Sequence, residues 1–367
     1  MERFDVVVVG SGPAGSTAAR FAARGGARTL LVDQRSELGH PVQCGEFLPS
    51  ARELSDLFPC PEVIAEAFVV PPETVLQETR EMVCISPGGR RFRFPLEGYV
   101  ISRRAYDKRL ALDAEGEGAE LRFPRGVTRV RDRLVEFAGG EQVDATVIVG
   151  ADGPLSTVGR SVGFTPPREM FRMITATVAG EGSPDIELYF GRLAPGGYAW
   201  RFPRAHDANV GLGVSQLPNG HRLDGLLEEF VGRESWGPAS DRTRWWVPLG
   251  PPPESAVRGR AIFAGDAANL VMATNGGGIP TAVLSGRDAG VAAARHVREG
   301  VPLSEYDRLW RAHLAGPLAR GYRVKRFADR FIQSDLLVAG GMRYIGGAGL
   351  DAMMRLRWPP RLGWLSS

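Results

Sequence analysis

The N-terminus joins a buried strand, a glycine-rich turn and a helix, and this unit constrains the fold more than any other feature. The run Phe4–Val9 is apolar and β-branched, as in a central parallel strand. It leads into the turn Gly10–Gly15 (GSGPAG) and a helix of small residues that ends near Arg24. A second strand, 29–32, ends in Asp33. This order predicts a Rossmann-type dinucleotide-binding domain.

Each glycine of the turn has a physical reason to be there. Gly10 allows the tight turn, Gly12 lets the backbone approach a pyrophosphate, and Gly15 lets the helix pack closely on the strand. The helix N-terminus then faces the negative charge of the ligand. Asp33 lies 21 positions after Gly12, which is close to the spacing expected for the acidic residue that binds a ribose.

Two later segments repeat the pattern of an apolar strand that ends in a polar turn. The strand 147–150 is followed by Asp152 and Gly153, and the strand beginning at Ala261 ends at Gly265 and Asp266. A run of three glycines, 276–278, then precedes a helix expected from Ile279 to about Val297. Glycines at a helix start let its free N–H groups approach a planar ring closely, and the positive end of the helix stabilises negative charge there.

This set of motifs resembles the FAD-binding domain of the flavoprotein hydroxylase superfamily, over roughly residues 1–300. The resemblance implies FAD as the cofactor and a fold like that of glutathione reductase and p-hydroxybenzoate hydroxylase. It implies that Asp266 holds the ribityl chain, that Asp152 lies near the pyrophosphate and that Arg103 lies on the cofactor side. The other residues expected at the cofactor are Gly10, Gly12, Ala14, Gly15, Asp33, Gln34, Cys44, Gly45, Gly265, Gly276, Gly277, Gly278 and Ile279.

The middle of the chain has a different periodicity. Between residues 166 and 253 polar and apolar residues alternate in short runs such as 186–190 and 198–202, which predicts antiparallel strands. The predicted architecture is α/β: a Rossmann-type FAD domain, an inserted antiparallel sheet that binds substrate, and a helical C-terminus. The expected ranges are 1–70, 97–165 and 256–300 for the FAD domain, 71–96 and 166–255 for the sheet, and 301–367 for the helical region.

One strand of the expected sheet is rich in aromatic residues. Tyr198, Trp200 and Phe202 alternate along it and therefore share one face, Pro203 ends it, and the sequence Gly-Leu-Gly follows at 211–213. This pattern resembles the geranylgeranyl reductase family, which saturates double bonds in archaeal digeranylgeranylglycerophospholipids, prenyl quinones and the chlorophyll tail. The resemblance implies that these four residues contact a long isoprenoid chain. On the pattern alone, the aromatic residues are also compatible with an ordinary sheet core.

The same resemblance suggests the chemistry. It implies protonation of the alkene and hydride transfer from flavin N5, inside a dry apolar tunnel that aligns the reactants. Cys44 and Gly45 match a family segment near the flavin ring, and Cys44, Tyr198 and Trp200 are the candidate catalytic residues. Cys44, Tyr198 and a flavin-bound water remain alternative proton donors. The main alternative activity on this scaffold is a flavin monooxygenase of the aromatic hydroxylase type.

Composition excludes several partners. The net charge of +3 gives no support for nucleic-acid binding, and the five histidines are scattered, so no metal site is expected. No second glycine motif follows another strand, so we expect a transient electron donor, which is NAD(P)H, a ferredoxin or a deazaflavin. The three cysteines form no CxxC pattern and indicate a reducing, cytoplasmic compartment.

The C-terminal segment 320–367 differs in charge from the rest of the chain. It contains nine Arg or Lys and three Asp, which gives +6 against −3 for the remainder. Its basic and aromatic residues at near-helical spacing are typical of a helix that lies on an anionic membrane surface. We therefore expect peripheral contact with the inner membrane face, although a helix packed on the FAD domain has the same pattern. No run reaches the roughly 18 apolar residues that a membrane span needs.

Overall fold

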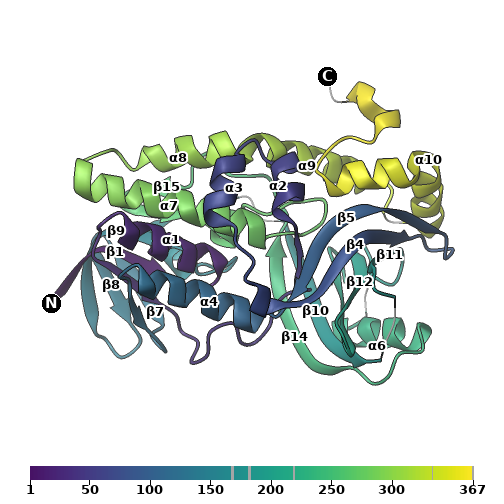
Figure 1. Ribbon diagram of the computed structural model, residues 1–367, viewed down its shortest axis with the longest axis horizontal. Coiled ribbons are helices and arrows are strands. Elements are labelled where there is room, and N and C mark those ends of the chain that lie inside the picture. The colour runs from purple at the N-terminus through teal and green to yellow at the C-terminus, as the bar shows by residue number, and fades with distance from the viewer. Residues whose placement is uncertain (167–168, 181–182, 218–219, 333, 366–367) are drawn as a thin grey trace.

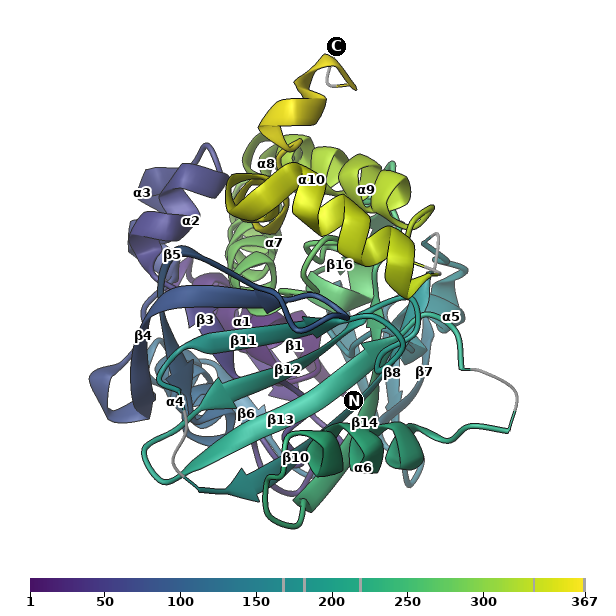
Figure 2. The same cartoon turned by 90° about the vertical axis from the view of Figure 1, so that its right-hand side faces the viewer.

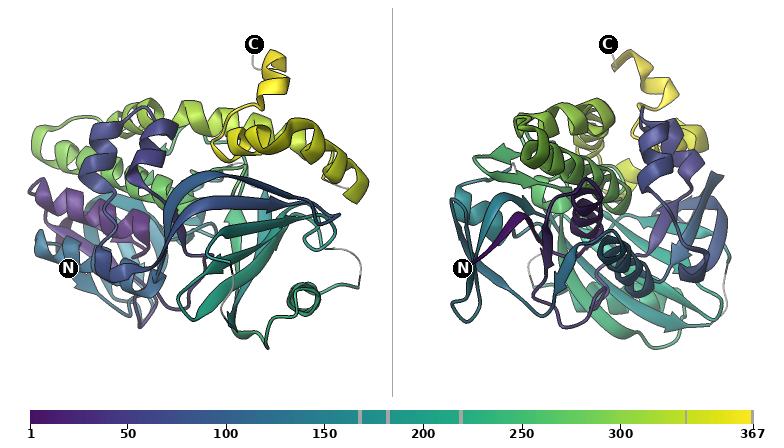
Figure 3. Two further views of the ribbon diagram at one scale, coloured as in Figure 1. Left: turned by 45° about the vertical axis from the view of Figure 1, so that its right-hand side comes forward. Right: turned by 60° about the vertical axis from the view of Figure 1, so that its left-hand side comes forward.

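The computed structural model describes residues 1–166, 169–180, 183–217, 220–332 and 334–365. Two sheets lie at opposite ends of the long axis of the molecule, and a layer of helices from the C-terminal half runs above both (Figures 1 and 3). The expected ranges 166–255 and 301–367 include 167–168, 181–182, 218–219, 333 and 366–367, which lie outside the described residues.

The first sheet has the predicted Rossmann arrangement. Its strands follow the order β15-β16-β9-β1-β2-β6, and β1 pairs in parallel with both β2 and β9. The hairpin of β7 and β8 continues antiparallel from the start of β9. The strands are β1 (Glu2–Val9), β2 (Thr29–Val32), β6 (Glu120–Arg122), β7 (Val127–Arg131), β8 (Leu134–Phe137), β9 (Gln142–Gly150), β15 (Val257–Arg258) and β16 (Ala261–Phe263).

Helix α1 (Pro13–Arg24) begins directly after the glycine turn and is buried along most of its length. It packs against α4 (Arg103–Gly116) and α7 (Ile279–Glu299). Close packing requires glycine in α7, because a Cβ added at Gly286 would lie 2.3 Å from the Ala14 carbonyl oxygen. The remaining elements of this half are α2 (Ala51–Leu57), α3 (Pro61–Ala67), η1 (Pro72–Thr74), α5 (Thr157–Val162) and η2 (Gly265–Ala268).

The second sheet is almost entirely antiparallel, as predicted. Its order is β14-β10-β13-β12-β11-β4-β5-β3, and only the pair of β11 and β4 is parallel within the described residues. The strands are β3 (Phe47–Pro49), β4 (Val75–Ile85), β5 (Arg91–Ile101), β10 (Met170–Ala179), β11 (Ile186–Phe190), β12 (Tyr198–Pro203), β13 (Asp207–Val214) and β14 (Ser240–Pro248). The edge strand β3 comes from the range expected in the FAD domain, and sequence reasoning did not predict it.

The two faces of this second sheet are covered by different helices (Figure 2). Helix α6 (Leu223–Arg233) packs on one face through Leu227 and Phe230. The other face carries Trp200 and Phe202 in an apolar cluster that also contains Met342 of α10 (Asp335–Met354). The predicted helical C-terminus is confirmed and consists of α8 (Ser304–Trp310), the π-helical turn η3 (Arg311–Ala315), α9 (Gly316–Ala328), α10 and η4 (Pro360–Leu365).

Candidate active site

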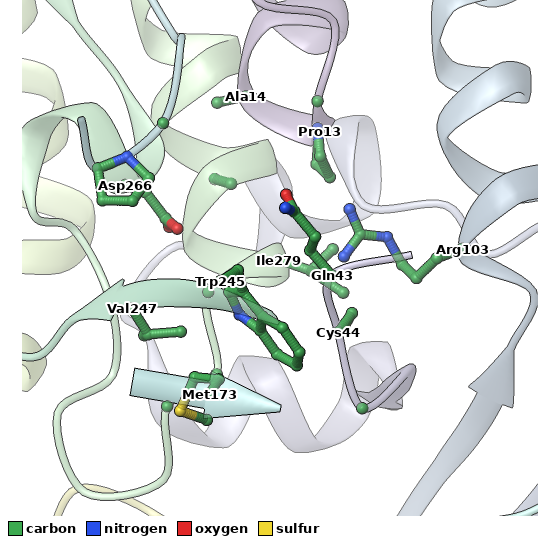
Figure 4. A pocket seen from close by; sticks show the side chains of 18 of the residues that line it. Pro13, Ala14, Gln43, Cys44, Arg103, Met173, Trp245, Val247, Asp266 and Ile279 are labelled. Atoms are coloured by element: carbon green, nitrogen blue, oxygen red, sulfur yellow. The ribbon is translucent and has the colours of Figure 1, made fainter. Parts of the chain in front are cut away.

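A cavity of about 1040 Å³ lies between the carboxyl ends of the parallel strands and the α10-facing side of the second sheet. Figure 4 shows Arg103, Gln43 and Cys44 on one side of it and Trp245 and Met173 on the other. Most residues predicted from the sequence line this cavity: Gly10, Gly12, Ala14, Asp33, Gln34, Cys44, Gly45, Arg103, Asp152, Tyr198, Trp200, Phe202, Asp266, Gly276, Gly277, Gly278 and Ile279. The structure therefore brings together residues that are up to 269 positions apart, from Gly10 to Ile279.

Three predicted residues do not belong to the cavity wall. A Cβ at Gly15 would lie 1.7 Å from the Gly10 carbonyl oxygen, so Gly15 permits close packing behind the turn. Gly265 has a φ of 59° and packs between Ala14 and Ala282, and its N–H donates to Ser285 Oγ at 3.0 Å. Pro203 pairs with Ala208 at the end of β12 and does not line the cavity.

The glycine turn presents backbone to the cavity. Gly10 has a φ of 99°, and no atom lies within 4 Å of a Cβ added at Gly12. The carboxylate of Asp33 holds the turn in place, because Oδ2 accepts hydrogen bonds from the Ser11 backbone N–H at 2.7 Å and from Ser11 Oγ at 2.9 Å. The N-terminus of α1 therefore stays open toward the cavity, with its backbone N–H groups directed at any anion bound there.

Asp152 has a structural task that the sequence did not reveal. Its carboxylate accepts hydrogen bonds from Ser156 Oγ at 2.5 Å and from the N–H groups of Thr157 at 2.6 Å and Val158 at 3.1 Å. Burial raises the pKa of Asp152, while these hydrogen bonds oppose the rise. The side chain thus caps the start of α5, at the edge of the cavity.

A second helix N-terminus opens into the cavity at α7. Gly278 is the residue before the helix, and a Cβ there would lie 3.2 Å from Asp266 Oδ1, so only glycine fits easily. Burial raises the pKa of Asp266 to about 6, against the attraction of Arg103. The hydroxyl of Tyr198 donates to the Asn275 carbonyl oxygen and so ties the aromatic strand to the glycine run.

These observations fit FAD. The cavity has two uncapped helix N-termini, at α1 and α7, which suit a pyrophosphate and a ring that gains negative charge on reduction. Glycines at 12, 277 and 278 expose backbone where a Cβ would narrow the space. Asp33 and Asp266 would offer carboxylate oxygens to hydroxyl groups of the cofactor. Bound there, FAD would accept and donate hydride equivalents. Within the described residues, no group of three or more His, Cys, Asp or Glu side chains could hold a metal ion.

Cys44 lies between Arg103 and the aromatic strand. Burial raises the pKa of its thiol, and the nearby Arg103 guanidinium opposes the rise. The thiol therefore keeps its proton at neutral pH. Arg103 is fixed by two hydrogen bonds to Asp107, of 3.0 and 2.8 Å, so it cannot swing away from the thiol without breaking them. Figure 4 shows Arg103 directed into the cavity beside Gln43.

The glycines around the aromatic strand make room for its rings. Tyr198, Trp200 and Phe202 lie on the same face of the second sheet, as the alternation predicts. A Cβ at Gly211, which pairs with Trp200, would lie 2.3 Å from the indole ring. A Cβ at Gly45 would lie 2.5 Å from the ring of Phe202. The loop and β13 can approach the aromatic side chains this closely only because positions 45 and 211 are glycine.

Sequence reasoning missed a buried polar network behind this wall, centred on Asn209. Its Oδ1 accepts hydrogen bonds from Trp200 Nε1 at 2.9 Å and from Thr175 Oγ1 at 2.7 Å. Its Nδ2 donates to the Cys44 carbonyl oxygen at 3.0 Å and to Glu46 Oε2 at 3.2 Å. Asn209 thus satisfies all its hydrogen-bonding groups and fixes the indole and the Cys44 loop together. The sequence contains no local pattern that identifies it.

Glu46 is the second residue of this network that was missed. It has a φ of 72°, in the left-handed region, and its side chain is buried. Its carboxylate accepts a hydrogen bond from the Arg103 backbone N–H at 3.0 Å and forms an ion pair with Arg204. A strained backbone at a buried, paired carboxylate is typical of a functional site. The loop that carries Cys44 is therefore held both from α4 and from the second sheet.

Comparison with known proteins decides the family. The model of the geranylgeranyl reductase catalytic domain matches residues 170–242, and that of the FAD dependent oxidoreductases matches residues 5–40. A digeranylgeranylglycerophospholipid reductase of Methanothermobacter thermautotrophicus is 34% identical over 363 residues, which cover 90% of this chain and 88% of that protein. The chain belongs to the geranylgeranyl reductase family. It is an FAD-dependent oxidoreductase, as the sequence predicted.

Solved structures agree on the fold. The crystal structure of a geranylgeranyl bacteriochlorophyll reductase-like protein from Thermoplasma acidophilum has a TM-score of 0.83 at 24% identity, and covers 100% of this chain and 99% of that chain. A probable FAD-dependent monooxygenase from Pseudomonas aeruginosa reaches 0.66 at 17% identity, and covers 93% of this chain and 100% of that chain. At these identities the two structures show that this reductase-family chain shares the fold, and no more.

Proposed function

We propose that this protein saturates isolated double bonds in the geranylgeranyl chains of a membrane lipid. The observation that carries the proposal is the path of the cavity across the second sheet. Residues of β14, β10, β12, β11, β4 and β5 line it, in that order along the sheet: Trp245 and Val247, Met173, Trp200, Leu188, Met82 and Leu96. Neighbouring strands lie about 4.8 Å apart. The seven adjacent strands from β14 to β5, with β13 among them, therefore span about 30 Å. Such a long apolar groove suits an extended isoprenoid chain.

The residues of the chain have separable tasks in this reaction. FAD bound in the cavity would supply the hydride once reduced. The apolar wall of Met173, Leu188 and Trp200 excludes water from the double bond. Cys44 holds a proton on Sγ beside the cavity, whereas the Tyr198 hydroxyl already donates to a backbone carbonyl. We therefore assign the proton that adds to the alkene to Cys44, and we assign Tyr198 and Trp200 to the shape of the wall.

We further propose that the enzyme works at the cytoplasmic face of a membrane and takes electrons from a transient donor, either a nicotinamide, a ferredoxin or a deazaflavin. Within the described residues, no helix is both long and apolar enough to cross a membrane. Exposed apolar side chains gather in the C-terminal region, where Leu336 is 81% exposed and Phe331, Leu337 and Tyr344 are also exposed. These side chains, next to basic residues, are suited to the membrane interface.

Anaerobic reoxidation tests the activity. The FAD-loaded protein is reduced with dithionite, a geranylgeranyl lipid is added in detergent, and the flavin absorbance and the product masses are followed. Reoxidation with stepwise gains of two hydrogens is the expected result. Reoxidation only after air is admitted, with an oxygen atom in the product, would instead establish a monooxygenase. Sedimentation with anionic vesicles tests the membrane contact, and Leu336→Asp is expected to weaken it.

A further inference from the structure

We infer that Arg320, Arg323 and Arg357 form a binding site for a phosphate group on the head of the lipid substrate. The inference rests on the proposed function, because it names the head group that the same cavity accepts. The three arginines lie where α2, α9 and the end of α10 meet, beyond the apolar groove. None of the three lines the cavity, so the polar end of a chain held in the groove would extend past the cavity wall to reach them.

The cavity wall comes within two residues of Arg357 along the chain, because Arg355 is its last lining residue. At this end it is formed by Leu54 and Leu57 of α2 and by Met354 and Arg355 at the end of α10. The chain then turns at Leu356, which is fully buried and has a φ of 58°.

The turn at Leu356 packs closely on α9. A Cβ added at Gly321 would lie 2.8 Å from Leu356 Cδ2, so glycine allows the close approach. The residue after the turn, Arg357, is thereby held between α2 and α9.

Hydrogen bonds to backbone carbonyls fix two of the three guanidinium groups. Arg357 Nη2 donates to the Asp56 carbonyl oxygen at 2.6 Å, next to Leu57 of the cavity wall. Arg320 Nε donates to the Leu356 carbonyl oxygen at 2.9 Å. Arg323 lies three residues after Arg320 on the same helix face. Each guanidinium has five N–H donors, so donors remain for a ligand.

The charge of this group is not balanced by the protein. In the described ranges, no carboxylate lies within 4.0 Å of the guanidinium nitrogens of these three residues. Burial lowers the pKa of Arg320, and the positive charges of Arg357 and Arg323 lower it further. By contrast, neighbouring Arg355 pairs with Glu53 and Asp351, so its charge is neutralised. Three guanidinium groups that repel one another gain stability when an anion binds among them.

Phosphate is the anion that best matches this arrangement. Guanidinium groups bind phosphate oxygens through paired, charge-assisted hydrogen bonds, and arginine is favoured for this over lysine. A phosphorylated prenyl lipid also matches both parts of this arrangement, because it has an apolar chain for the groove and an anionic end for the arginines. A neutral prenyl alcohol has only the first property.

The test compares two ligands that differ in the phosphate alone. Binding of geranylgeranyl phosphate and of geranylgeraniol is measured in detergent by quenching of tryptophan fluorescence, since Trp200 and Trp245 line the cavity. For the Arg320→Gln/Arg357→Gln double variant we expect about a tenfold higher Kd for the phosphate. The Kd for the alcohol is expected to stay within twofold. Arg129→Gln, an exposed arginine of β7, is the matched control and should change neither value.

Other outcomes overturn the inference. If the double variant weakens the binding of both ligands equally, the arginines only support the wall. If it changes neither Kd, the arginines do not bind phosphate. Loss of anionic-vesicle binding with an unchanged ratio of the two Kd values would assign them to membrane phosphates instead. If the double variant is unstable to heat, the single exposed variant Arg323→Gln replaces it, with a smaller expected change in the same ratio. Because binding is measured without turnover, failure to reduce either ligand would count against the proposed function alone.

Discussion

Replacing Asn209 with alanine tests how much the buried polar network contributes to the site. The change removes four hydrogen bonds, but two of the four partner groups, those of Thr175 and Glu46, keep another interaction. Thr175 Oγ1 remains 3.1 Å from the Val210 carbonyl oxygen, and Glu46 keeps its ion pair with Arg204. Trp200 Nε1 and the Cys44 carbonyl oxygen lose the only partner that they have among the described residues.

The expected cost follows from these two groups. Each buried polar group left without a partner costs about 1–3 kcal/mol, so Asn209→Ala should lower the free energy of unfolding by about 3 kcal/mol. Urea unfolding of the FAD-free protein, followed by circular dichroism, measures this. Thr175→Val is the matched control, because it removes one hydrogen bond of the same network and should cost about 1 kcal/mol. A loss for Asn209→Ala no larger than that of the control would refute the reasoning.

Three further predictions concern the cavity. Asp266 has a pKa of about 6 in the folded state and of about 3.9 in the unfolded state, so folding disfavours the ionised carboxylate. The free energy of unfolding therefore falls as the pH rises from about 4 through 6. Asp266→Asn should therefore stabilise the FAD-free protein by about 3 kcal/mol at pH 8 and about 1 kcal/mol at pH 4.5 in urea unfolding, and an equal gain at both pH values would argue against burial as the cause. Tyr198→Phe removes the hydroxyl that holds the glycine run before α7. In a titration of the FAD-free protein the Kd for FAD should rise about tenfold. An unchanged Kd would show that the glycine run needs no support from Tyr198. Gly45→Ala places a Cβ against Phe202 and should cost about 1–3 kcal/mol of unfolding free energy. The control Gly88→Ala, which meets no atom within 4 Å, should be close to neutral, and equal losses would contradict the packing argument.

The sequence predicted those parts of the molecule in which neighbouring residues determine the structure. The turn from Gly10 to Gly15 requires backbone conformations and close contacts that only glycine allows, so a short motif identified it. Alternation along 198–202 placed three aromatic rings on one face, because successive strand residues point to opposite sides. Both inferences depend on residues within one element, and the structure confirms both arrangements.

The parts that sequence reasoning missed depend on contacts between distant elements. The exception is Asp152, which was expected near the pyrophosphate and whose carboxylate accepts a hydrogen bond from the Thr157 N–H, five residues later, at the start of α5. Asn209 lies 165 residues from Cys44 in the chain, yet it binds the Cys44 carbonyl. Likewise, β3 joins the edge of the second sheet although it follows the FAD-binding segment. A single sequence contains no pattern for such pairings, because each depends on how the two sheets pack.

The packing also links the cofactor end of the cavity to the substrate wall and to the C-terminal helices. Tyr198 of β12 donates to the Asn275 carbonyl, and Asn275 Nδ2 donates to the Met354 carbonyl at the end of α10 at 2.9 Å. Met354 lies two residues before the turn at Leu356 that places Arg357 beside α9. One chain of hydrogen bonds therefore connects the aromatic strand, the glycines before α7 and the segment that ends the groove. A ligand that orders this last segment would also restrain the glycine run, where FAD is expected to bind, so lipid and cofactor should each increase the affinity for the other.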